Sequence, residues 1–158
     1  HRLSAKSDGP FLVQNASALP PELFEADLFG YESGAFTGAE RTRTGFLFQA
    51  AGGTFHLEEI GDLELPVQQL LLTVIEKRSV RPIGASGSRA IDVRFVFSTH
   101  RDPDELLRTG KIRRDLFFRI NAARIPLPPL AEQHRIVAKI EKPLLAIPDA
   151  KCRTGKYS

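Results

Sequence analysis

Two adjacent carboxylates, Glu58 and Glu59, are the side chains whose types and spacing most directly suggest chemistry in this sequence. They follow the run Thr54–Leu57, which predicts a strand. In open parallel sheets, ligands bind at the carboxyl ends of the strands. A carboxylate pair at such an end can hold a hydrated Mg²⁺ and polarise an attacking water. Capping of the next helix explains the same pair without catalysis, so the residues alone leave both possibilities open.

Polar side chains also follow two other predicted strands. Asn15 ends the run Phe11–Asn15, and Thr99 and His100 follow the β-rich run Val93–Phe97. An amide at a strand end can simply bond the backbone. An imidazole can donate a hydrogen bond, and its charge depends on pH. The residues alone leave the role of these groups open.

The spacing of apolar residues predicts the elements that position these groups. We expect helices over Leu19–Phe29, Gly45–Ala51, Pro66–Glu76 and Asp102–Gly110, and a hairpin over Ser79–Asp92. In the clearest helix, Pro66–Glu76, one apolar stripe faces the core: Val67, Leu70, Leu71, Val74 and Ile75. Because strands alternate with helices, we expect an α/β sandwich around a parallel sheet. His56, inside a strand, is expected to be a hydrogen-bonded sheet residue and not a metal ligand.

The segment Gly34–Ala39 places one bare aromatic residue, Phe36, between two glycines. Glycine at 34 and 38 costs a helix about 1 kcal/mol each relative to alanine, which favours a loop. An apolar side chain at a flexible tip is poorly placed for core packing. The alternative is a buried turn whose phenylalanine packs inward.

The six letters of this loop, GAFTGA, within ELFEADLFGYESGAFTGA, match the signature of bacterial enhancer-binding proteins. Residues 1–130 resemble the AAA+ domain of these activators of sigma-54 RNA polymerase. The resemblance implies a homo-oligomeric ring that hydrolyses ATP between subunits and contacts sigma-54 through Gly34, Ala35, Phe36, Thr37, Gly38 and Ala39. DNA would be bound by domains outside this chain.

The strand-end residues fit the same family. GGTFHLEEIGDL resembles the Walker B segment GGTLFLDEI, which implies that Glu58 is associated with Mg²⁺ through water and that Glu59 activates the attacking water. Asn15 matches an asparagine that bonds this catalytic glutamate in the family. Thr99 and His100 occupy the position of a Thr-Asn pair that senses the γ-phosphate. Glu58 replaces an aspartate and His100 an asparagine, and both departures alter the reach of the side chain.

The segment RRDLFFR resembles FREDLYYRL of the family, in which two arginines reach the ATP of the neighbouring subunit. Arg113 and Arg119 match these arginine fingers. A guanidinium group suits this role because it stabilises charge on a transferring phosphoryl group. Pairing of both arginines with surface acids is the alternative.

Two parts of the family pattern are missing from this chain. The sequence contains no G-x-x-x-x-G-K-[ST] phosphate loop and no C-terminal helical lid. We therefore expect a partial AAA+, P-loop NTPase-like three-layer sandwich that lacks the first strand and binds ATP weakly or not at all. An inert fragment or interaction module without ATP turnover is the alternative function.

The C-terminal part breaks from the family. Residues 127–142 resemble a segment of type I restriction-enzyme specificity subunits, so 131–158 are expected to form an atypical helix and tail, either foreign to the family or a divergent helix. Residues 108–158 carry 12 basic and 4 acidic side chains, which permits a DNA-contacting chimera or an ordinary solvated surface. One cysteine, Cys152, excludes an internal disulfide and is typical of a cytoplasmic protein. No apolar run is long enough to span a membrane.

Overall fold

A three-stranded parallel sheet forms the centre of the protein in the computed structural model, which describes residues 1, 3–18, 20–128, 132 and 135. The strands are β1 (Phe11–Asn15), β4 (Thr54–Glu58) and β7 (Arg94–Phe97), in the spatial order β1-β4-β7. Phe11 pairs with Thr54 and Thr54 with Arg94, so the strands run side by side in register. The predicted α/β class with a parallel sheet is confirmed.

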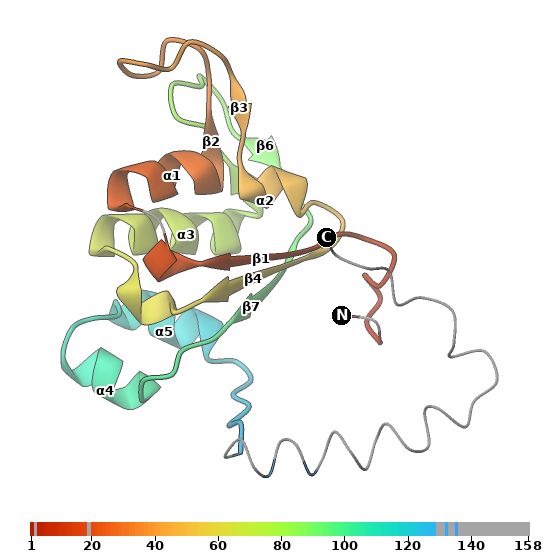
Figure 1. Ribbon diagram of the computed structural model, residues 1–158, viewed down its shortest axis with the longest axis vertical. Coiled ribbons are helices and arrows are strands. Elements are labelled where there is room, and N and C mark those ends of the chain that lie inside the picture. Colours follow the sequence, from red (N-terminus) through yellow and green to blue (C-terminus); the bar gives the residue numbers. More distant parts are fainter. Residues whose placement is uncertain (2, 19, 129–131, 133–134, 136–158) are drawn as a thin grey trace. The chain divides into compact units, whose positions relative to one another are not determined.

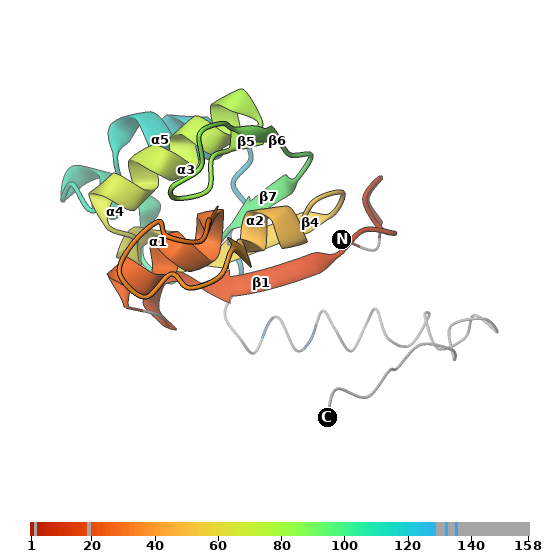
Figure 2. The same cartoon turned by 90° about the horizontal axis from the view of Figure 1, so that it is seen from above.

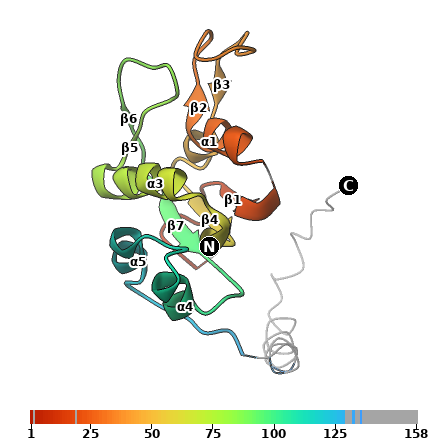
Figure 3. The same ribbon diagram turned by 90° about the vertical axis from the view of Figure 1, so that its left-hand side faces the viewer.

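The described α-helices are α1 (Pro21–Phe29), α2 (Phe46–Gln49), α3 (Leu65–Lys77), α4 (Pro103–Arg108) and α5 (Arg114–Ile120). Three of them, α1, α3 and α5, lie along one face of the sheet (Figure 3). Figure 2 shows α3 lying between α1 and α5, and Figure 3, which looks along the strands, shows all three along one side of the sheet. Phe55 and Leu57 of β4 are fully buried against these helices, together with Leu28, Leu71 and Leu116.

The opposite face of the sheet is more open. Side chains alternate between the two faces of a strand, and Phe11, Val13 and Val96 are 51%, 41% and 37% exposed on this second face. His56 lies among them and bonds Ser98 Oγ through Nε2 at 2.9 Å, as expected for a satisfied sheet residue.

Two short antiparallel ribbons project from the helical side (Figure 1). The first pairs β2 (Gly30–Tyr31) with β3 (Arg43–Thr44), and the second pairs β5 (Ser79–Val80) with β6 (Arg89–Ala90). The second ribbon is the predicted hairpin.

Residues 1–122 form one compact unit, and 123–158 are assigned to a second. In the second unit, 124–128 contain no helix or strand. The helix and tail expected over 131–158 fall outside the described residues, apart from positions 132 and 135, and remain a prediction. Within the part of the chain that the structure describes, no helix is long and apolar enough to cross a membrane.

Candidate functional site

The carboxyl ends of the three strands bring the predicted polar residues to one edge of the sheet. Asn15, the last residue of β1, pairs in register with Glu58, the last residue of β4. Beyond the end of β7, Ser98 N donates to Leu57 O at 3.1 Å, and Ile60 N donates to Ser98 O at 3.2 Å. These bonds carry the chain past the strand end, so that Glu59 and the segment after Ser98 lie together.

Glu59 is the best-defined side chain of this edge. One carboxylate oxygen, Oε2, lies 2.7 Å from His100 Nδ1, 3.4 Å from His100 N and 3.5 Å from Thr99 Oγ1. The side chain of Glu59 is 23% exposed. The hydrogen bond from His100, above all, lowers the pKa of Glu59 against the opposing effect of burial. The carboxylate is therefore held ionised and oriented, with the imidazole as its main partner.

The backbone of Glu59 is strained. Its φ of 55° and ψ of 50° place it in the left-handed region, where it precedes the 3-10 turn Ile60–Asp62. For a residue other than glycine this conformation costs about 1–2 kcal/mol, and such outliers cluster at functional sites. The turn that follows is fixed by a bond from Asp62 N to Glu59 O at 2.8 Å.

Asn15 is engaged locally. Its Oδ1 accepts hydrogen bonds from Ser17 N at 2.9 Å and Ser17 Oγ at 2.7 Å, which close a side-chain turn. Among the described residues no hydrogen bond joins Asn15 to Glu59. The structure thus brings together Glu59, Thr99 and His100. It places Asn15 beside Glu58, with the side-chain oxygen of Asn15 bonded to Ser17 in the 3-10 turn Ala16–Ala18.

The donor set at this edge suits a cation shared with phosphate. Within the described residues no group of three or more His, Cys, Asp or Glu side chains is arranged to hold a metal ion. Mg²⁺ commonly takes only one or two carboxylates, with waters and substrate phosphates completing its shell. Glu58 and Glu59 fit that partial role and not a site made of protein ligands alone.

The Gly34–Ala39 loop closes on itself at the end of the β2–β3 ribbon. Gly34 N donates to Ala39 O at 2.8 Å, and Ala39 N donates to Phe36 O at 3.0 Å. Gly34 and Gly38 have φ of 81° and 99°, although a methyl group at either position would meet nothing within 4 Å. Backbone conformation, and not crowding, therefore requires glycine at both positions.

Phe36 is not a core residue. It is 43% exposed, and its ring packs edge-on against Tyr31, with 5.0 Å between centroids. The loop also leans on the second ribbon, because Glu32 N donates to Ile83 O at 3.0 Å and Gly84 lies directly against Ala35. The loop thus holds the half-exposed side chain of Phe36 at its tip, and contacts with the second ribbon support the base of the loop.

The two predicted arginines, one just before α5 and one within it, have different surroundings. Arg113, just before the helix, forms a two-point ion pair with Asp115: Nε to Oδ1 is 3.0 Å and Nη2 to Oδ2 is 2.6 Å. This contact raises the pKa of Arg113 and lowers the pKa of Asp115. Arg119, six residues later, is exposed and makes no hydrogen bond or ion pair within the described residues.

Gln68, which the apolar pattern did not single out, is fully buried in α3 beside the start of α5. Its Nε2 donates to Leu63 O at 2.9 Å and to Lys111 O at 2.8 Å, and its Oε1 accepts from Arg113 N at 2.8 Å. The available signal in the sequence was the spacing of Gln68. It precedes the buried Leu71 and Leu72 by three and four residues, and residues at these spacings lie on the same face of a helix.

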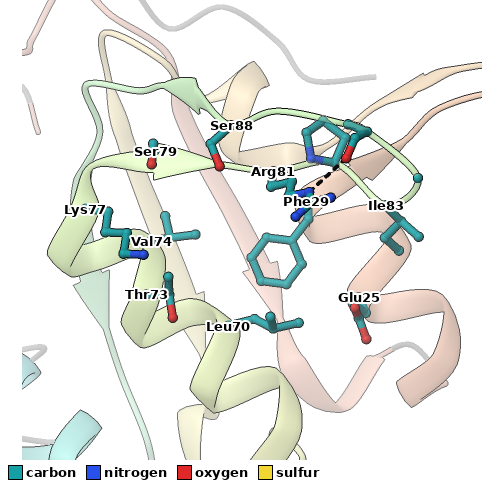
Figure 4. A pocket seen from close by; sticks show the side chains of 13 residues that line it. Glu25, Phe29, Leu70, Thr73, Val74, Lys77, Ser79, Arg81, Ile83 and Ser88 are labelled. Carbon is teal, nitrogen blue, oxygen red and sulfur yellow. Dashed lines mark hydrogen bonds between the residues drawn. The ribbon is translucent and has the colours of Figure 1, made fainter.

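An open pocket of about 520 Å³ lies between α1, α3 and the β5–β6 ribbon (Figure 4). Phe29, Leu70 and Ile83 line it, and Arg81 Nε donates to Ala85 O at 2.8 Å on the ribbon side. The prediction that Leu70 faces the core is wrong in this respect: it is 39% exposed and faces the pocket.

The chain matches the sigma-54 interaction domain over residues 1–126. The chain belongs to the sigma-54 interaction domain family. Among its relatives are the transcriptional regulatory protein GlrR of Escherichia coli K12, 43% identical over 92% of this chain and 33% of GlrR, and the regulator NtrC of the same strain, 40% identical over 93% of this chain and 31% of NtrC. The predicted family is confirmed.

Solved structures agree with the fold. This sigma-54 interaction domain superposes on NtrX of Brucella abortus with a TM-score of 0.77 and 27% identity, covering 92% of this chain and 33% of NtrX. The structure of NtrX in complex with ATP matches with a TM-score of 0.75 and 26% identity, over 96% of this chain and 32% of NtrX. The domain therefore spans about a third of the proteins it resembles. The predicted likeness of residues 127–142 to a restriction-enzyme subunit lies almost entirely outside the described residues.

Proposed function

We propose that this domain contacts sigma-54 RNA polymerase through the Gly34–Ala39 loop and acts within a cytoplasmic, ring-forming activator of transcription. The observation that carries the proposal is the half-exposed Phe36 on a ribbon anchored at its base. An aromatic side chain that is partly exposed on a monomer is well suited to bury itself in a partner pocket. Membership of the sigma-54 interaction domain family supports sigma-54 as that partner.

We further propose that the carboxyl edge of the sheet serves ATP hydrolysis in the assembled ring. NtrX, a structural relative, has been solved with ATP, which supports nucleotide binding in the family. Bound ATP would supply the free energy for remodelling. Glu59, ionised and oriented, would accept the proton of the attacking water, and Glu58 would help hold Mg²⁺. Thr99 and His100 would respond to the terminal phosphate.

Arg113 and Arg119 would extend from α5 towards the nucleotide of a neighbouring subunit. Asn15 would bond Glu59 only after leaving its turn with Ser17. The 158 residues contain no phosphate loop, so we propose that this chain alone binds ATP weakly and does not turn it over. Micromolar affinity for Mg·ATP in a calorimetric titration of this chain would contradict that last proposal.

The sigma-54 contact is tested by biolayer interferometry of this chain against purified sigma-54. Phe36→Ala should weaken binding by about tenfold or more, because it removes the aromatic contact surface. Phe118→Ala is the matched control: Phe118 is 61% exposed on α5, and its loss should leave binding unchanged. Equal effects of the two changes, or none from Phe36→Ala, would refute the assignment of the loop.

A further inference from the structure

Gln68 is the one fully buried side chain with an amide group among the described residues, and each part of that amide is used. Its two N–H groups go to backbone carbonyls at Leu63 and Lys111, and its oxygen accepts the backbone N–H of Arg113. The three distances lie between 2.8 and 2.9 Å. A buried amide satisfied in this way holds its partners in a fixed relation, since losing one bond leaves a polar group unpaired in the interior.

The three partners belong to segments that flank the candidate site. Leu63 ends the turn that follows Glu59, and its carbonyl lies just before α3. Lys111 and Arg113 lie in the connection from α4 to α5, 43 and 45 residues further along the chain from Gln68. One side chain therefore ties the segment after the candidate water-activating carboxylate to the segment that carries Arg113.

The hydrogen bond from Arg113 N to Gln68 fixes the backbone at Arg113, while the guanidinium of Arg113 is held by other contacts. Arg113 is the residue just before the first turn of α5, and Gln68 supplies an acceptor to its N–H. The guanidinium is held by Asp115 on the exposed surface. If the guanidinium leaves Asp115 for a phosphate, the position from which it extends is still set by Gln68.

We infer that Gln68 is a positioning residue for Arg113, acting through the backbone N–H, and thereby for phosphoryl transfer at the neighbouring subunit. This inference rests on the proposed function only for its catalytic consequence. The positioning itself is a property of this chain and is tested on the chain alone.

The first test compares two glutamines of the unaltered chain by NMR hydrogen exchange. Gln69 is the neighbour of Gln68 and is exposed. The side-chain N–H groups of Gln68 and the backbone N–H of Arg113 should exchange at least about tenfold more slowly than the side-chain N–H groups of Gln69. Equal exchange rates for the two side chains would overturn the inference. Because the experiment uses only the unaltered chain, its outcome does not depend on whether a variant folds.

The second test uses a matched pair of substitutions in the full chain. Gln68→Met conserves length and removes every hydrogen bond of the amide, whereas Gln69→Met makes the same change on the surface. Only Gln68→Met should accelerate exchange of the Arg113 N–H, by about tenfold or more, while the N–H of Leu71 in the core of α3 stays protected. Unchanged exchange at Arg113 in Gln68→Met would overturn the inference.

The catalytic consequence is tested by ATPase assays on the complete natural polypeptide that carries these residues. Gln68→Met should lower kcat by about 10- to 100-fold with KM for ATP nearly constant, because a displacement of about 1 Å can cost that much. In an Arg113→Ala background the same change should have less than about a twofold effect, since the two residues act as one unit.

The outcomes separate the two claims. Normal turnover in Arg113→Ala would refute the proposed role of that arginine and leave the exchange results to decide on positioning. A loss in Arg113→Ala without a loss in Gln68→Met would overturn the present inference alone. An equal loss from Gln68→Met with and without Arg113 would show a purely structural role and would overturn it as well.

Discussion

Gly45→Ala should damage the base of the ribbon that carries the Gly34–Ala39 loop. Gly45 lies just before α2 and against the end of α1. A Cβ placed on it would lie 2.3 Å from Gly30 N, 2.4 Å from Phe29 C and 2.6 Å from Leu28 O. Ordinary contacts of a Cβ begin near 3.4 Å, and these neighbours are backbone atoms that cannot rotate away.

The cost follows from the shift that such a contact demands. The two backbone segments must separate by about 1 Å, which places the change among overpacking substitutions that cost about 1–3 kcal/mol. The movement also strains the pairing of Gly30 with Thr44, and each net hydrogen bond lost adds about 0.5–1.5 kcal/mol. We expect Gly45→Ala to lower the free energy of unfolding by about 2–4 kcal/mol.

Two other glycines serve as graded controls, with urea denaturation as the assay. Gly87 has open space around it and no positive φ, so Gly87→Ala should be neutral or slightly stabilising. Gly52 also has open space but a φ of 79°, so Gly52→Ala should cost about 1 kcal/mol from backbone conformation alone. If Gly45→Ala proves no worse than Gly87→Ala, the argument from backbone contact is refuted.

Two further predictions concern α3 and the strand-end carboxylate. Leu71→Ala should lower the free energy of unfolding by about 2–5 kcal/mol because Leu71 is fully buried, whereas Leu70→Ala should lower it much less because Leu70 is 39% exposed. Denaturation midpoints of the two variants make the comparison. Similar losses of stability would contradict the assignment of the two residues to different faces of α3. His100 lowers the pKa of Glu59 below its ordinary value of 4.5, so the stability from this contact is present above about pH 4.5 and is lost as pH falls through the lower folded value. The stability difference between the parent chain and Glu59→Gln should therefore shrink on acidification below pH 4.5, and a constant difference would count against the contact.

The sequence predicted the elements well where apolar spacing was strong. The helix expected over Pro66–Glu76 is observed over Leu65–Lys77, and the expected strand Phe11–Asn15 is observed with the same bounds. The faces of α3 were harder to assign. Leu70 fits the apolar stripe by spacing, yet it lines a pocket because the β5–β6 ribbon and α1 do not close over it.

Gln68 shows why a buried polar residue escapes prediction. Its side chain is stable inside only because Leu63 O, Lys111 O and Arg113 N converge on it, and two of these partners lie more than 40 residues away. Local periodicity contains no information about that convergence. The contact of Glu59 with His100, across 41 residues, depended in the same way on the order of the strands.

The side chains of the candidate site differ in how far away in the sequence their hydrogen-bond partners lie, and this distance determines what must move before each bond can break. Asn15 bonds Ser17 and Arg113 bonds Asp115, each two residues away, so both side chains can leave their partners by rotation without opening the core. The bond of Gln68 to Arg113 N joins distant elements in the interior, where breaking it leaves a polar group unpaired. The side chains that the proposed function requires to move are thus held by near neighbours, whereas the backbone from which Arg113 extends is held by the fold.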